Sequence, residues 1–143
     1  RMMGSFADKE NKPVKQRVLV VDDDEGLREI FNITLSMDDF EVASAPDGAA
    51  ALAIMEQFKP DFIALDLMMP VMNGMQFCGK LTQLGIRIPI IIVSAYWEPA
   101  NEALLRQDPN IVGFIHKPIR YATLAESIRK ILPAGGKPDT SAP

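Results

Sequence analysis

Several short apolar runs of the sequence end in a side chain that can bind a cation or an anion. Carboxylates follow the first and third runs, a hydroxyl group follows the fourth, and an ammonium group follows the fifth. Taken singly, each has an ordinary explanation, since an acid after a strand often caps the next helix, as we expect of Asp24. Taken together, they form a pattern that caps and turns do not explain. The residues are Asp22, Asp23, Asp24, Asp66, Ser94 and Lys117.

Brought together, these groups would make a site for a phosphoryl group. Neighbouring carboxylates repel, so one of them takes a proton unless a cation intervenes. Mg²⁺, or Mn²⁺ in its place, prefers oxygen ligands and keeps water molecules for a phosphate-bearing substrate. The Ser94 hydroxyl and the Lys117 ammonium group would add a donor and a fixed charge. A carboxylate can itself attack phosphorus and become an acyl phosphate. The sequence has no glycine-rich loop of the kinds that bind nucleotide phosphates, so nucleotide binding is not indicated.

The stretch from 17 to 132 alternates strand-like and helix-like patterns, which is typical of an α/β fold with a parallel sheet. Ligands of such sheets bind beyond the carboxyl ends of the strands, so the polar residues above are expected on one rim. The predicted strands are 17–21, 40–44, 62–65, 88–93 and 111–116, and the predicted helices are 25–37, 49–58, 75–84, 98–107 and 121–132. The spacing in the first helix predicts a buried face formed by Leu27, Ile30, Phe31, Thr34 and Leu35.

Composition excludes several other classes of protein. The chain has 143 residues and a net charge of −4, with an acidic central part, which disfavours binding to a nucleic-acid backbone. One cysteine and one histidine exclude an internal disulfide bond and a multi-histidine metal site within one chain. No apolar run approaches the roughly 20 residues that span a membrane, and no leader is evident. We therefore expect a cytoplasmic protein without a membrane partner.

The chain is expected to form one domain with two appended ends. Residues 1–16 are polar and without period, and we expect a disordered or expression-derived N-terminal extension there. Residues 17–132 form the expected domain. Residues 133–143 are rich in proline and glycine and are expected to be a flexible tail or linker.

The order and spacing of these segments closely resemble the receiver domains of bacterial response regulators, in particular the chemotaxis-regulator-like ones. The resemblance covers roughly residues 17–132 and implies a flavodoxin-like, doubly wound, five-stranded parallel sheet of order 2-1-3-4-5 with five helices. The segments that carry it are Val20–Asp24, Ala64–Gly74, Ile92–Ala95 and His116–Ile119, together with the turn Ser44–Gly48.

The resemblance assigns the acidic residues. Asp66 matches the phosphoacceptor of the family. Asp22 and Asp23 match its acidic pair, which implies that Asp23 binds Mg²⁺ directly and Asp22 mostly through water. The backbone carbonyl of Met68 is implied as a further metal ligand, beside Asp66 itself.

The resemblance also assigns the residues that would bind and sense the phosphoryl group. Lys117 matches the lysine that pairs with it, and Ser94 matches the switch hydroxyl. Phe114 matches the switch aromatic, which turns inward after phosphorylation. Phe114 stands where the family often has tyrosine, so a phenol hydroxyl is lacking. Pro118 matches the proline that follows a cis peptide bond, which would join it to Lys117.

The implied activity is that of a phosphorylatable switch in a two-component system or phosphorelay. Asp66 would take a phosphoryl group from a phosphohistidine of a sensor histidine kinase or phosphotransfer protein. The domain would catalyse only its own phosphorylation and dephosphorylation. A downstream partner would bind the face of the fourth helix, fifth strand and fifth helix, at 98–107, 111–116 and 121–132. A weak homodimer is a further expectation.

Two positions near the site carry bulky residues rather than small polar ones. Met68 holds water poorly, and Tyr96 is large enough to shield a phosphoryl group, so a long-lived phospho-Asp66 is expected. Tyr96 and Trp97 form an adjacent aromatic pair that either covers the core or meets a partner.

Two other functions compete with the switch. A Mg²⁺-dependent phosphatase with an aspartyl nucleophile also ends a strand with Asp, but such enzymes usually place a second acid two residues later. Here Met68 stands at that position. A receiver-like module that binds partners without phosphorylation is the second alternative, and the complete set of acidic, hydroxyl and lysine residues weighs against it.

Overall fold

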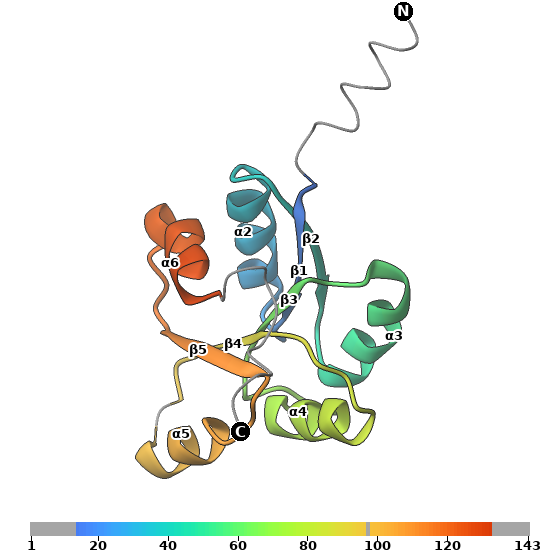
Figure 1. Ribbon diagram of the computed structural model, residues 1–143. Helices are drawn as coiled ribbons and strands as arrows, with labels where there is room; N and C mark the ends of the chain where they lie inside the picture. Colours follow the sequence, from blue (N-terminus) through green and yellow to red (C-terminus); the bar gives the residue numbers. More distant parts are fainter. Residues whose placement is uncertain (1–13, 97, 133–143) are drawn as a thin grey trace, which may run out of the picture.

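The computed structural model describes residues 14–96 and 98–132 (Figure 1). The expected N-terminal extension lies outside the described residues as far as residue 13, and the expected tail at 133–143 and Trp97 also lie outside them. The first strand begins at Gln16, one residue earlier than predicted.

The described residues contain a single parallel sheet of five strands in the order β2-β1-β3-β4-β5. This order confirms the flavodoxin-like topology. Apolar residues of β1 point alternately to the two faces, with Leu19 in one buried cluster and Val20 in the other. The strands are β1 Gln16–Val21, β2 Phe40–Ala45, β3 Phe62–Leu65, β4 Ile90–Ser94 and β5 Ile111–His116.

Helices cover both faces of the sheet (Figure 1). Two of them, α2 and α6, pack on one face, and the other three pack on the opposite face. Both faces of the central strands β3 and β4 are therefore buried, which explains why their sequences are nearly continuously apolar. In the described residues the helices are α2 Glu25–Ser36, α3 Gly48–Phe58, α4 Gly74–Gln83, α5 Pro99–Leu105 and α6 Leu124–Ile131. No helix in the part of the chain that the structure describes is long and apolar enough to cross a membrane.

Most element boundaries differ from the predictions, and the larger differences lie in β4, α5 and the last helix. β4 begins at Ile90 rather than 88, since Pro89 lacks the N–H that a strand position needs, and it continues through Ser94. α5 begins at Pro99 and ends at Leu105, shorter at both ends than predicted. The last helix opens with a 3-10 turn at Tyr121–Thr123 before α6 begins.

The predicted buried face of the first helix is partly wrong. Phe31 and Leu35 of α2 are buried, and Leu27 packs at their edge. Ile30 is 44% exposed, so it lies beside the buried stripe and not within it. The 3,4 spacing alone does not decide which flanking apolar residue the sheet covers.

Candidate functional site

Asp66 lies at the carboxyl end of β3, in the centre of the sheet. Its N–H donates to the carbonyl of Val21 at 2.9 Å, so the parallel pairing of β1 and β3 continues to this residue. The side chain is almost entirely buried, with 5% of the residue exposed. Little of this carboxylate is therefore open to solvent, at the carboxyl edge of the sheet.

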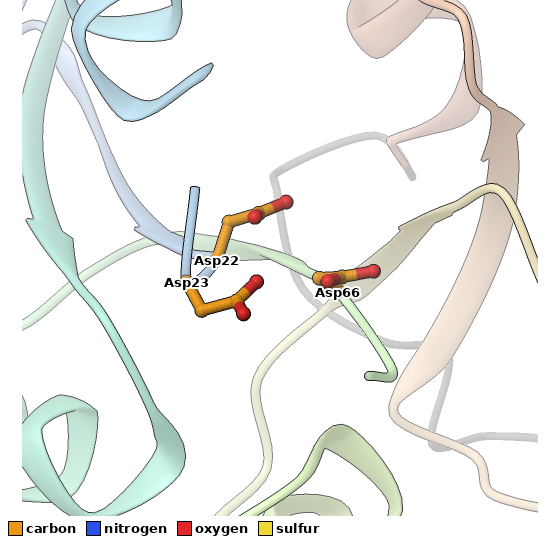
Figure 2. A group of neighbouring side chains, drawn as sticks. All are labelled: Asp22, Asp23 and Asp66. Carbon is orange, nitrogen blue, oxygen red and sulfur yellow. The ribbon is translucent and has the colours of Figure 1, made fainter. Parts of the chain in front are cut away.

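Two more carboxylates lie beside it. Asp22 and Asp23 follow β1, the neighbour of β3, and Figure 2 shows their side chains next to that of Asp66. One carboxylate oxygen from each residue lies within 4.8 Å of the others. Asp22 is buried, whereas Asp23 is exposed. The predicted gathering of strand-end acids on one rim is therefore observed in the structure.

The Asp22 carboxylate is held on both of its oxygens. Its Oδ1 accepts a hydrogen bond from the N–H of Asp24 at 2.9 Å, and its Oδ2 accepts one from Lys117 Nζ at 2.8 Å. Arg28 Nη1 donates to the Asp22 carbonyl at 2.7 Å, which ties the turn to α2. Asp24 caps that helix as predicted, because its Oδ1 accepts from the N–H of Leu27.

Lys117 follows β5 and reaches back across the rim to the acids. Its Nζ lies 2.8 Å from Asp22 Oδ2 and 3.7 Å from Asp66 Oδ1. Burial lowers the pKa of Lys117, but the hydrogen bond with Asp22 and the charges of both carboxylates outweigh it and raise the pKa overall. The ammonium group therefore keeps its charge. The peptide bond between Lys117 and Pro118 is cis.

The acids outnumber the cation that faces them. Burial raises the pKa of Asp66, and the charge of Asp22 raises it further, while Lys117 lowers it. This balance leaves a site of three oxygen donors with excess negative charge, which matches the ligand preference of a hard divalent cation. The donor set therefore fits Mg²⁺.

Ser94 and Phe114 belong to neighbouring strands. Ser94 is buried as the last residue of β4, and its Oγ accepts a hydrogen bond from the N–H of Tyr96 at 3.1 Å. Phe114 lies on β5, paired in register with Ile92 and partly buried against the cluster on the α3–α5 face. The guanidinium carbon of Arg106 lies 4.5 Å from the centre of the Phe114 ring.

Met68 and Tyr96 lie at the exposed edge of the site. Met68 is 60% exposed and Tyr96 is 41% exposed. The hydroxyl of Tyr96 donates to Glu98 Oε1 at 2.8 Å, and this acceptor raises the pKa of the phenol. The shielding roles of both residues, and the Met68 carbonyl as a metal ligand, stay predictions.

Two residues that support the site were not singled out from the sequence. A Cβ atom at Gly74 would collide with the backbone oxygen of Asp66 and lie 2.8 Å from Leu67 Cα. Glycine is therefore needed where α4 begins against the segment that carries Asp66. Arg28 is the second, and its contact with a backbone carbonyl leaves no signal in the sequence.

Comparisons with known proteins agree with this geometry. The family model of the response regulator receiver domain matches residues 18–129. The response regulator MprA of Mycobacterium leprae is 33% identical over 126 residues, which are 88% of this chain and 54% of that protein. MprA of Mycobacterium bovis is 33% identical over 81% of this chain and 50% of its own length. The chain thus spans about half the length of the curated relatives it matches.

Solved structures show the same architecture. The chemotaxis protein CheY4 of Vibrio cholerae aligns with a TM-score of 0.74 and 29% identity, over 82% of this chain and 99% of that one. The BeF3-activated receiver domain of RstA from Klebsiella pneumoniae aligns with a TM-score of 0.72 and 25% identity, over 81% and 97% of the two chains. With the family model spanning most of the chain, this protein belongs to the response-regulator receiver domains of two-component systems.

Proposed function

We propose that this domain accepts a phosphoryl group on Asp66 from a phosphohistidine of a sensor histidine kinase or phosphotransfer protein. The observation that carries the proposal is the buried Asp66 carboxylate, with two further acids within 4.8 Å and Lys117 Nζ at 3.7 Å. A nucleophile, a cation-binding set and a fixed positive charge thus meet at one point.

The transfer is a displacement at phosphorus. One oxygen of the Asp66 carboxylate forms the new bond to phosphorus while the bond from phosphorus to the donor imidazole nitrogen breaks. The electron pair of that bond leaves with the imidazole, and the product is an acyl phosphate. Lys117 would offset the negative charge that arrives, and its present contact with Asp66 allows this with a small movement of a flexible side chain.

Four groups would hold the metal ion. They are the carboxylates of Asp22, Asp23 and Asp66 and the backbone carbonyl of Met68. Since both Asp22 oxygens already accept hydrogen bonds, Asp22 is the acid best suited to act through water. When bound, Mg²⁺ or Mn²⁺ would supply positive charge and a template for the phosphoryl oxygens.

The phosphorylated state would be read through Ser94 and Phe114. We propose that the Ser94 hydroxyl donates to a phosphoryl oxygen and that the Phe114 ring turns inward behind it. This would change the surface of α5, β5 and α6, where a downstream partner or a weakly associating second copy would bind. The domain would act in the cytoplasm.

Mass spectrometry after treatment with acetyl phosphate and Mg²⁺ tests the central step. We expect one acid-labile phosphate on the wild-type chain and none on Asp66→Asn. A phosphate that persists in the variant would mean a different nucleophile. No phosphate on either chain would favour a module that binds partners without phosphorylation, and sustained release of phosphate from unrelated monoesters would favour a phosphatase.

A further inference from the structure

The ring of Phe114 lies against a cation that belongs to a different element. The guanidinium carbon of Arg106 is 4.5 Å from the centre of the ring, well within the range of a cation–π contact. Arg106 directly follows α5, whereas Phe114 lies within β5. The contact therefore joins the end of a helix to the ring that is proposed to move when Asp66 is phosphorylated.

Arg106 is held over the ring by a residue one helical turn earlier. Its N–H donates to the carbonyl of Glu102 at 2.9 Å, and its Nε donates to Glu102 Oε2 at 3.2 Å. Glu102 thus fixes both the backbone and the side chain of Arg106. The Arg106 side chain is 59% exposed, so much of it stays in contact with water while it lies over the ring.

Phe114 lies beside the strand that ends in the proposed switch hydroxyl. It pairs with Ile92 of β4, two residues before Ser94, and it packs against the apolar cluster on the α3–α5 face. If the ring turned further inward, the guanidinium would stay behind, because a charged group that entered the cluster would lose its water. The contact is therefore made in the orientation of the ring seen here and lost in the inward one.

A second contact of the same kind lies far from the site. The guanidinium carbon of Arg129 is 4.7 Å from the centre of the Phe40 ring. Phe40 is the first residue of β2, at the amino edge of the sheet, and no movement is proposed for it. The two contacts thus match in chemistry and differ in their relation to Asp66.

We infer that Arg106 is a positioning residue that holds Phe114 in the orientation seen here and so opposes the phosphorylated state. The inference rests on the proposed phosphorylation of Asp66 and the proposed inward turn of Phe114. A ligand that favours the inward state binds with an apparent affinity that falls as the population of that state falls. Because the contact with Arg106 lowers this population, it should weaken the binding of any group that takes the place of the phosphoryl group.

Binding of BeF3⁻ in the presence of Mg²⁺ measures this balance, since the anion resembles a phosphoryl group and needs no donor. Arg106→Met keeps an apolar side chain of similar reach but removes the charge. It should tighten BeF3⁻ binding about twofold to fivefold, the range of an exposed cation–π contact, while Mg²⁺ alone binds with the wild-type affinity. Isothermal titration calorimetry measures both affinities. Glu102→Gln, which loosens Arg106 without removing it, should give a smaller gain in the same direction.

Two controls separate this role from a general effect of charge or stability. Arg129→Met removes the same charge and a contact of the same kind, and it should leave the BeF3⁻ affinity unchanged. In a Phe114→Leu background, Arg106→Met should have no effect on this affinity, because the ring through which Arg106 acts is gone.

Wild-type BeF3⁻ affinity in Arg106→Met would overturn the inference, as would an equal gain in Arg129→Met or in the Phe114→Leu background. The initial rate of labelling by acetyl phosphate should rise in the same proportion as the affinity, which gives a second route to the same comparison. If the wild type binds no BeF3⁻ and acetyl phosphate does not label Asp66, the proposed function itself is wrong, and the inference falls with it.

Discussion

Asp66 lies where the chemistry proposed for it and the stability of the folded chain conflict. Burial and the charge of Asp22 raise its pKa above the ordinary 3.8, against the opposing charge of Lys117. A carboxyl group with a raised folded-state pKa holds its proton more tightly in the folded chain. Its contribution to stability therefore falls as pH rises from 3.8 through the folded pKa, and at neutral pH the ionised group is destabilising.

Asp66→Asn should for this reason raise the free energy of unfolding of the metal-free protein at neutral pH. The expected gain is about 0.5–2 kcal/mol, the usual size of a favourable single change. Urea unfolding in the presence of a chelator measures it. The gain should disappear well below pH 3.8, where Asp66 is protonated in both states, and a gain that persists there would contradict an electrostatic origin.

Met68 and Tyr96 give a second prediction at the level of single residues. In the proposed phosphorylated state, loss of the phosphoryl group needs a water molecule in line with the bond from Asp66 to phosphorus. Met68→Asn would add groups that hold water, and Tyr96→Ala would open the edge of the site. Each should speed first-order dephosphorylation by about threefold to tenfold, a barrier change of about 1 kcal/mol.

Tyr96→Phe is the control for this prediction. It keeps the ring but removes the hydrogen bond to Glu98, so a lifetime close to that of the wild type would support shielding by the ring. If neither Met68→Asn nor Tyr96→Ala changes the rate, shielding does not control the lifetime.

At the level of elements, α4 carries two glycines with different demands. Gly74 begins the helix against the backbone of Asp66 and Leu67, whereas a Cβ atom at Gly79 would meet nothing within 4 Å. Gly74→Ala should therefore lower the free energy of unfolding by about 1–3 kcal/mol, since backbone atoms must shift. Gly79→Ala should raise it by roughly 0.5–1 kcal/mol through helix propensity. Thermal unfolding of the pair tests this, and equal effects would rule out the collision as the cause.

The elements also show which features of the fold and of the site can be predicted from the sequence alone. Apolar runs predicted the strands, and parallel pairing then required their carboxyl ends to meet, which is why Asp22 and Asp66 could be placed together. The backbone of Val71, with a φ of 63°, could not be predicted, because a β-branched residue rarely adopts this left-handed conformation. The exposure of Ile30 could not be predicted either, since it depends on how α2 sits on the sheet.

At the level of the whole molecule, the sheet couples the site to the two apolar clusters on its faces. β1 and β3 carry the three acids at their ends, and both strands are buried on both faces. The acids are therefore held close together only while the sheet is folded. An ion that binds the acids must bind the folded chain in preference to the unfolded one, and it must stabilise the entire domain by mass action.

As a ligand of the proposed site, Mg²⁺ would stabilise the folded domain against global unfolding. At a concentration about ten times its dissociation constant, Mg²⁺ should raise the free energy of unfolding by about 1.4 kcal/mol. Urea unfolding with MgCl₂, against NaCl of matched ionic strength, measures the increment. Asp23→Asn removes one ligand from the exposed side of the cluster without disturbing the buried pair, so it should lose most of the increment while keeping the wild-type stability in NaCl. An increment of equal size in Asp23→Asn would show that the ion acts by general screening of the acidic domain and not at this site.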